Sequence, residues 1–165
     1  MPLEQDDETG RRKLRFVVAF SSPKRSARTV EAAARHGKAL GAEVVLVRMI
    51  PDPEKVGVVA QLISSDRPHD KAKSQIDDVV AKLKEQGVNA WGEVRIGQVA
   101  EGIVKAAVEL KADLLFVGTT TIGAQSPTFF MMKKDPIVHY LVDHSPISLC
   151  LIRHDVLTDS ELENE

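Results

Sequence analysis

The fold is decided by the stretch from residue 112 to residue 153, which begins Ala112-Asp113-Leu114-Leu115-Phe116-Val117-Gly118. This apolar run predicts a strand that ends at the glycine. A loop over residues 119–135 follows, then a short helical segment over 136–143 and a last apolar strand over 147–152. A strand that ends in glycine and is followed by a loop leading into a helix is how open α/β proteins build a site for an anion or a nucleotide.

The rest of the chain alternates strand and helix patterns. Apolar runs predict strands over residues 14–20, 44–50 and 88–96. Helices are expected between them, the first with Ser22 as N-cap and Pro23 as its first residue. Successive β-then-α units imply right-handed crossovers, so we predict one doubly wound α/β domain with a mainly parallel sheet and helices on both faces.

Domain limits follow from the charged ends of the chain. The predicted domain spans residues 13–154, between a flexible tail over 1–12 and a flexible acidic tail over 155–165. Residues 56–63 are apolar but short, and either a short helix or a packed loop fits them. Arg11, Arg12, Lys13 and Arg15 lead into the first strand, where they are expected to keep the tail in solution.

The composition of the chain disfavours several classes of function. The 165 residues carry a net charge of −2, so no basic excess favours nucleic acid, and no apolar stretch is long enough to predict membrane insertion. The single Cys150 lies in an apolar run, which suits a reducing compartment. The N-terminal residues are acidic, unlike a signal peptide, and a cytoplasmic location is therefore expected.

Several segments together resemble the universal stress protein family, over residues 14–153. They are Val17-Val18-Ala19-Phe20-Ser21, Ala39-Leu40-Gly41-Ala42-Glu43-Val44, Gly97-Gln98-Val99-Ala100-Glu101-Gly102-Ile103, Ala112 to Gly118, and His144-Ser145-Pro146. The resemblance implies a five-stranded sheet of order 3-2-1-4-5, with a ligand crevice between strands one and four. It also implies a homodimer in which the last strand pairs with its two-fold mate.

The nucleotide-binding residues of that family are mostly replaced. ATP-binding members close the first strand with an aspartate, where this chain has Ser21. Their loop reads Gly-x2-Gly-x9-Gly-Ser/Thr. Gly118 matches its first glycine, but Thr121 stands at the second and Asp135-Pro136 at the final pair, after a longer interval. The candidate nucleotide or anion site consists of Ser21, Ser22, Gly118, Thr119, Thr120 and Thr121.

These replacements disfavour phosphate. A β-branched threonine resists the positive φ that glycine adopts. Asp135 adds negative charge where a phosphate needs positive potential, although Lys133 and Lys134 lie nearby in the sequence. No cofactor is expected, and an adenine nucleotide stays an open alternative.

Catalytic constellations are missing from the sequence pattern. The five histidines do not fall at metal-binding spacing, and no serine has a base placed beside it by sequence. We therefore expect no enzyme and no metal site, and interpret the chain as a regulatory or protective binding module for the stress response. The alternatives are an ATP-binding nucleotide-dependent switch and a protein that docks on a transporter or enzyme.

Two apolar segments are expected to contact a partner or to cover the crevice. Within the loop, Phe129, Phe130, Met131 and Met132 form either a lid over the crevice or a surface for an unidentified protein partner. The last strand is an apolar edge, which natural proteins pair or cover. The residues expected at the dimer interface are Ile147, Leu149, Leu151 and Arg153.

Overall fold

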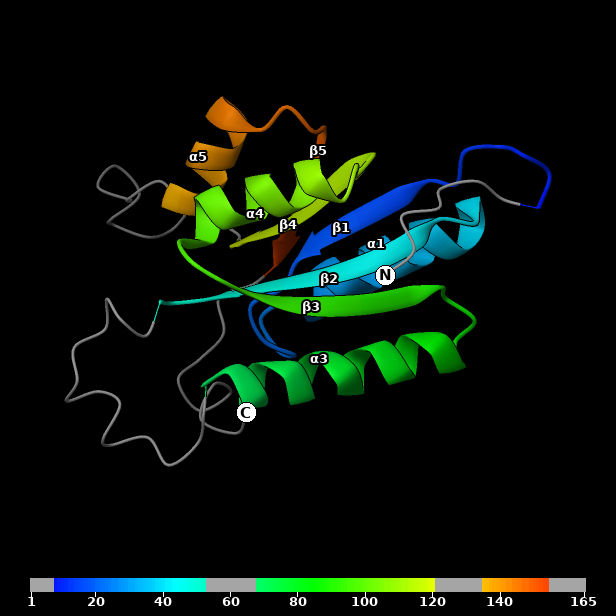
Figure 1. The fold of residues 1–165 in the computed structure, drawn as a ribbon, viewed down its shortest axis with the longest axis horizontal. Coiled ribbons are helices and arrows are strands. Elements are labelled where there is room, and N and C mark those ends of the chain that lie inside the picture. Colours follow the sequence, from blue (N-terminus) through cyan, green and yellow to red (C-terminus); the bar gives the residue numbers. More distant parts are fainter. Residues whose placement is uncertain (1–7, 53–67, 121–134, 155–165) are drawn as a thin grey trace.

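The computed structural model describes residues 8–52, 68–120 and 135–154, which form one sheet with helices on both sides (Figure 1). The strands are β1 (Arg15–Ala19), β2 (Glu43–Ile50), β3 (Ala90–Ile96), β4 (Leu114–Thr120) and β5 (Leu149–His154). All neighbouring strands are parallel, and their order is β3-β2-β1-β4-β5. The predicted doubly wound α/β fold and its strand order are confirmed.

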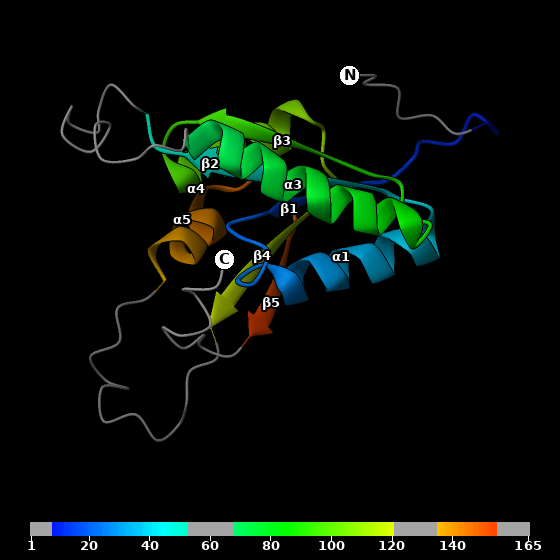
Figure 2. The same ribbon diagram turned by 90° about the horizontal axis from the view of Figure 1, so that it is seen from below.

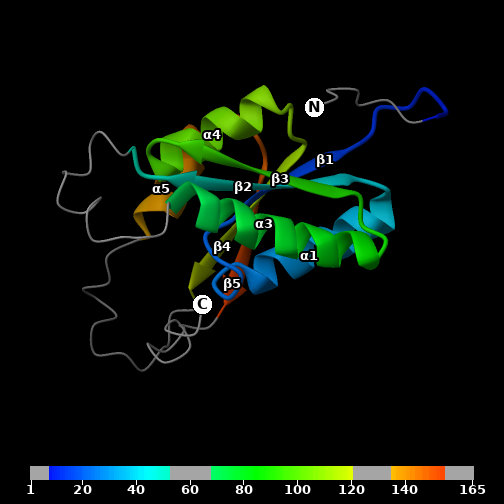
Figure 3. The ribbon, with the colours of Figure 1, turned by 60° about the horizontal axis from the view of Figure 1, so that its bottom comes forward.

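The helices divide between the two faces of the sheet. They are α1 (Ala27–Leu40), α3 (Pro68–Glu85), α4 (Val99–Glu109) and α5 (Pro136–His144). Helices α1 and α3 cover one face, and α4 and α5 cover the other. Figure 3 shows α4 on one side of β2 and β3, and α1 and α3 on the opposite side. At one edge β4 and β5 lie side by side (Figure 2), so β5 is an edge strand.

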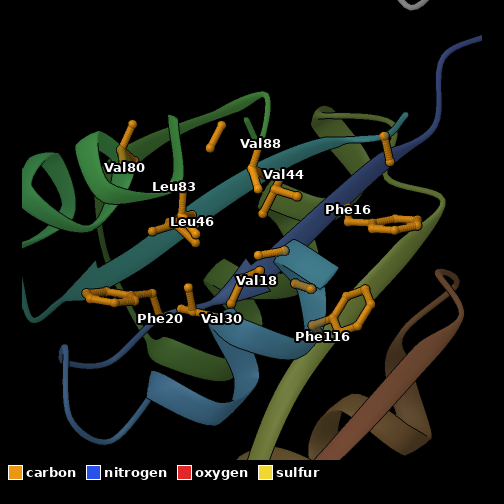
Figure 4. Close-up of a cluster of buried hydrophobic side chains, with 14 of the residues drawn as sticks. Phe16, Val18, Phe20, Val30, Val44, Leu46, Val80, Leu83, Val88 and Phe116 are labelled. Atoms are coloured by element: carbon orange, nitrogen blue, oxygen red, sulfur yellow. The ribbon is translucent and has the colours of Figure 1, made fainter. Parts of the chain in front are cut away.

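Alternate strand residues supply the two halves of the core. On the α1 and α3 side, Phe16 and Phe116 are fully buried with ring centroids 5.3 Å apart, in one cluster with Val18 and Leu46 (Figure 4). The intervening residues, such as Val17 and Val45, pack against α4 and α5 instead. The period of two expected of strands covered on both faces therefore holds.

Helix α1 lies close to the sheet because its inner face is made of small residues. A Cβ atom at Gly37 would come 2.7 Å from Cγ2 of Val44, so only glycine fits without a shift of the strand. Gly41 ends the helix with a φ of 64°, in the left-handed region that glycine tolerates. Both glycines thus fix where α1 lies and where it ends.

Several predicted boundaries are wrong, and three of them bear on the site. Helix α1 begins at Ala27, because residues 23–26 form turns rather than the first helical turn expected after Ser22. Strand β4 continues to Thr120 by pairing with Arg153 and His154, so the loop does not begin at residue 119. Strand β5 begins at Leu149 rather than at residue 147.

The tails were predicted on either side of a domain over residues 13–154. Residues 1–7 and 155–165 lie outside the described part of the chain, as do residues 53–67, and those expectations stay predictions.

Candidate functional site

A cavity of about 530 Å³ opens at the carboxyl ends of the strands, where β1 and β4 lie side by side. The chain leaves these two strands toward opposite faces of the sheet, and such switch points are where open α/β folds bind ligands. The cavity is lined by Ala19, Phe20, Ser21, Arg25, Ser26, Arg48, Met49, Val99, Ile103, Val117, Gly118, Thr119, Asp135, Ile137 and His154. Its size is in the usual range for a small-molecule site.

The β1 side of the cavity is a turn held together by serine hydroxyls. Ser26 Oγ accepts a hydrogen bond from the backbone N–H of Ser21 at 2.9 Å and lies 3.2 Å from the Ser21 hydroxyl oxygen. Ser22 Oγ accepts from the backbone N–H of Arg25 at 3.3 Å, and its carbonyl accepts from the N–H of Ser26 at 3.0 Å. Ser22 and Ser26 are both buried, and the turn they close places Arg25 at the cavity.

Gly118 in β4 is enclosed on the α1 side of the sheet. A Cβ atom there would lie 2.6 Å from Thr29 Oγ1 and 3.3 Å from the imidazole of His154. The space that a side chain would need is thus occupied by α1 and β5. The glycine is required for packing at this position, whether or not an anion binds beside it.

The N-terminus of α5 is capped by its own aspartate. Asp135 Oδ1 accepts hydrogen bonds from the backbone N–H groups of Ile137 at 3.0 Å and Val138 at 3.2 Å, and Pro136 has no N–H to offer. A carboxylate therefore occupies the donors that would otherwise face an anionic ligand at this helix end. The sequence predicted the unfavourable charge of Asp135 but not these hydrogen bonds.

The two arginines of the cavity lie on a different wall from the apolar residues of α4. Arg25 and Arg48 belong to the side nearer α1 and α3, and Arg48 Nη1 donates to Gln75 of α3. Met49, Val99 and Ile103 belong to the side covered by α4. The site therefore offers cations on one wall and apolar surface on the other.

The predicted site residues are only partly brought together. Ser21, Gly118 and Thr119 line the cavity as expected. Ser22 is instead a buried residue of the turn, and Thr120 pairs with His154 at the end of β4. Thr121 and the predicted lid or partner segment over residues 129–132 lie outside the described residues.

Sequence reasoning missed Arg25, Ser26 and Arg48. The segment Ser21-Ser22-Pro23-Lys24-Arg25-Ser26 carried a signal, since closely spaced serines before a helix favour hydroxyl-to-backbone bonds. Arg48, the one charged residue of the strand predicted over residues 44–50, carried another. Over the described ranges, no group of three or more histidine, cysteine, aspartate or glutamate residues could hold a metal ion. None of the helices in these ranges is long and apolar enough to cross a membrane.

Comparison of the sequence and the fold with known proteins shows the family to which this chain belongs. The sequence model of the universal stress protein family matches residues 14–153, nearly the whole described domain. The chain belongs to the universal stress protein family, as its sequence segments indicated. No curated protein sequence is similar enough to count as a match.

Solved structures of the same family share the fold. A universal stress protein from Lactobacillus plantarum is 18% identical over 87% of this chain and 99% of its own, with a TM-score of 0.64. One from Archaeoglobus fulgidus, solved in complex with dAMP, is 13% identical over 84% of this chain and 96% of its own, with a TM-score of 0.59. A family member from Arabidopsis thaliana with AMP bound is 13% identical over 87% of this chain and 93% of its own, with a TM-score of 0.57.

Proposed function

We propose that this chain is a non-catalytic universal stress protein, a regulatory or protective module whose cavity binds a small ligand without holding a triphosphate. The observation that carries this proposal is the cap of α5. Asp135 supplies its own carboxylate to the backbone donors of Ile137 and Val138, at the helix end that the family's loop would present to phosphates. A triphosphate there would have to displace this carboxylate and would also be repelled by its charge.

Replacing Asp135 by glycine tests the role of the cap. Asp135→Gly removes the negative charge and frees both N–H groups, and we expect the affinity for ATP to rise at least about tenfold, as charge-assisted hydrogen bonds become available. Loss of stability should be small, a few tenths of a kcal/mol, since glycine is a tolerated N-cap. Isothermal titration calorimetry with ATP on the full chain measures the change.

Two further variants separate charge from hydrogen bonding. Asp135→Asn removes the charge but keeps a capping oxygen, and should recover only part of the gain in affinity. Asp143→Asn makes the same charge change at the other end of α5, where Asp143 pairs with His139, and should leave ATP affinity unchanged. Equal ATP affinity in the unmodified chain and in Asp135→Gly would refute the role of the cap, and release of phosphate from ATP at an enzyme-like rate would refute a non-catalytic function.

The second candidate is a nucleotide-dependent switch. It is favoured by the cavity at the switch point and by family members solved with dAMP or AMP bound. Under this alternative an adenine nucleotide bound between Ser21 and Gly118 would regulate the protein. A thermal-shift comparison of ATP, ADP and AMP distinguishes the two, because a ligand at 100 times its Kd stabilises by about 2.7 kcal/mol. Stabilisation by ATP supports the switch, whereas stabilisation by AMP alone does not. Docking through residues 129–132 and a cytoplasmic location stay predictions from the sequence.

We further propose that the protein is a homodimer through β5. This strand forms the edge of the sheet beyond β4. Leu151 on β5 is 43% exposed and Val142 on α5 is 57% exposed. Leu149 and Ile147 instead pack partly against the core under α4 and α5, so Leu151 is the apolar residue of the strand most available to a partner. Such an edge suits an isologous pairing of two copies.

Replacing Leu151 by aspartate is expected to give monomers. A charge at the centre of the pairing would be desolvated opposite its own two-fold copy, which destabilises the dimer more than the fold. The control is Leu40→Asp, since Leu40 is 59% exposed at the end of α1 and belongs to a different part of the surface. Multi-angle light scattering should give a dimer mass for the unmodified chain and for Leu40→Asp; a monomer mass for the unmodified chain at high concentration refutes the dimer.

A further inference from the structure

We propose that Arg25 is the anion-binding residue of the cavity, that Arg48 assists it, and that the ligand is a small phosphate monoester with a flat, largely apolar body. This assignment rests on the proposed function, since it concerns the same cavity. It places the anionic group of the ligand on the wall opposite Asp135, and not at the N-terminus of α5.

The backbone of Arg25 is fixed by the serine turn. Its N–H donates to Ser22 Oγ, and the residues on either side of the turn are tied by the Ser21-to-Ser26 and Ser26-to-Ser22 hydrogen bonds. Ser22 and Ser26 are buried, so the turn is anchored in the body of the domain while the arginine side chain lines the cavity. A fixed origin for the side chain reduces the conformational entropy lost when a ligand binds.

The guanidinium of Arg25 is available to a ligand. Within residues 8–52, 68–120 and 135–154, its side chain has no hydrogen-bond or ion-pair partner, whereas its backbone N–H is bonded to Ser22. An arginine offers several N–H donors in a planar fork that matches the oxygens of a phosphate. An unpaired arginine at the wall of a cavity is therefore suited to bind an anion.

The basic residues at the N-terminus of α1 do not lie where they would stabilise the helix. Lys24 and Arg25 directly precede α1 and Arg28 lies in its first turn, which contains no acidic residue. The positive end of the helix dipole disfavours cations there. Arg25, which precedes the N-cap Ser26, therefore adds its positive charge to the positive end of the α1 dipole on this side of the cavity, where the two raise the potential that an anion would meet.

The second arginine extends the same wall. Arg48 lies on β2 with its side chain toward the face covered by α3, and Gln75 of that helix accepts a hydrogen bond from Nη1. Gln75 thereby orients the guanidinium of Arg48 through a neutral amide. Arg48 and Arg25 thus present positive charge to one cavity from two different elements.

The remaining walls of the cavity indicate the chemistry of the part of the ligand that carries no charge. Met49, Val99, Ile103 and Ile137 give an apolar surface on the side of α4 and α5. Asp135 disfavours negative charge at the edge of this surface, because its carboxylate lies at the N-terminus of α5. A single phosphate on an apolar body satisfies both walls, whereas an extended chain of phosphates would bring charge toward Asp135.

The test is isothermal titration calorimetry of the full chain with AMP, with adenosine, and with inorganic phosphate. AMP is the probe for the proposed ligand class, adenosine lacks the phosphate, and inorganic phosphate lacks the body. The variants are Arg25→Gln, Arg25→Lys and, as a matched control, Arg35→Gln. Arg35 lies on the same helix, is exposed, and pairs with Glu31 away from the cavity. Circular dichroism checks that every variant remains folded.

We expect the unmodified chain to bind AMP more tightly than adenosine or inorganic phosphate. Arg25→Gln should weaken AMP binding at least about tenfold while leaving adenosine binding unchanged, since a charge-assisted contact to phosphate is lost. Arg25→Lys should keep part of the affinity, because the charge remains and the fork does not. Arg35→Gln should bind AMP like the unmodified chain, and added salt should weaken AMP binding less in Arg25→Gln than in the unmodified chain, because one cation is missing.

The inference and the proposed function fail on different outcomes. Absence of AMP binding, equal affinity for AMP and adenosine, or equal effects of Arg25→Gln and Arg35→Gln would each overturn the assignment of Arg25, and none of these bears on the cap formed by Asp135. Enzyme-like turnover of ATP, or ATP affinity insensitive to Asp135→Gly, would overturn the proposed function while leaving the effect of Arg25→Gln on AMP interpretable.

Discussion

Replacing Arg15 by alanine is expected to lower the free energy of unfolding by about 3–5 kcal/mol, the loss typical when one partner of a buried ion pair is removed. Arg15 opens β1 and is only 1% exposed. Its Nε donates to Glu43 Oε2 at 2.5 Å, and its Nη1 donates to the carbonyl of Leu110 at 2.7 Å. Glu43 also accepts from Trp91 Nε1 at 2.7 Å, so one arginine connects β1, β2, β3 and the end of α4.

The loss comes mainly from the groups left behind. Without Arg15, the Glu43 carboxylate keeps its burial but loses its countercharge, and the carbonyl of Leu110 loses its buried donor. Equilibrium unfolding in urea measures the change. Adding Glu43→Gln to Arg15→Ala should recover part of the stability, because the amide carries no charge yet still accepts from Trp91.

A surface arginine provides the comparison. Arg35→Ala removes an exposed i,i+4 pair with Glu31 and should cost no more than about 0.5 kcal/mol. If Arg15→Ala prevents folding, Arg15→Met, which keeps the aliphatic volume, supplies the measurable variant, and its combination with Glu43→Gln should be the more stable of the two. A loss below about 1 kcal/mol for Arg15→Ala, well short of the range for a buried pair, would show that the network is not stabilising.

Arg15 also illustrates what the sequence could not reveal. In the sequence it is one of four basic residues before the first strand, and a role in solubilising the tail was predicted for all of them. Its burial depends on Glu43, which is distant in the chain and becomes a neighbour only through the β1–β2 register. Arg12 likewise pairs with Asp113 of the segment before β4. Charge patterns along a sequence do not identify such partners, whereas the apolar runs that form β1, β2 and β4 are local and were predicted.

The candidate site, too, was predicted only in part from the sequence. The position of the crevice followed from the strand order, which the family resemblance implied and which the fold confirms. The place of Arg25 at the crevice could not be predicted. The pair Ser22-Pro23 is a good local signal for the start of a helix, and it therefore predicted helix where the structure has a turn. Here Ser22 instead accepts from Arg25, and Ser26 from Ser21, which delays α1 to Ala27. The turn is stabilised by the burial of the Ser22 and Ser26 hydroxyls against the rest of the domain. Burial of this kind depends on tertiary contacts, which the local sequence does not show.

Replacing Gly118 by alanine is expected to lower the free energy of unfolding by about 1–3 kcal/mol, the range for inserting volume into a packed core. The added Cβ would lie 2.6 Å from Thr29 Oγ1, closer than atoms of this kind approach, and 3.3 Å from the imidazole of His154. Because Thr29 belongs to α1 and is 1% exposed, the clash is relieved only if the helix moves away from β4. Thermal and urea unfolding of the folded variant measure the loss.

The partner of the clash supplies the decisive second substitution. Thr29 Oγ1 is buried and has no hydrogen-bond partner among the described residues, so Thr29→Ala removes an unsatisfied hydroxyl and is expected to change stability little by itself. In the Gly118→Ala background, Thr29→Ala should restore most of the lost stability, because the space of the side chain is vacated. Thr29→Val keeps that volume and should restore none.

These outcomes separate packing from ligand binding as the reason for glycine at this position. If Gly118 serves a bound anion through its backbone, Gly118→Ala should weaken ligand affinity with little change in stability, and Thr29→Ala should not compensate. If it serves the contact of α1 with β4, stability should fall and Thr29→Ala should rescue it. The 2.6 Å approach to Thr29 favours the second result, in which packing alone accounts for glycine at position 118. Failure of Thr29→Ala to rescue Gly118→Ala would refute this explanation.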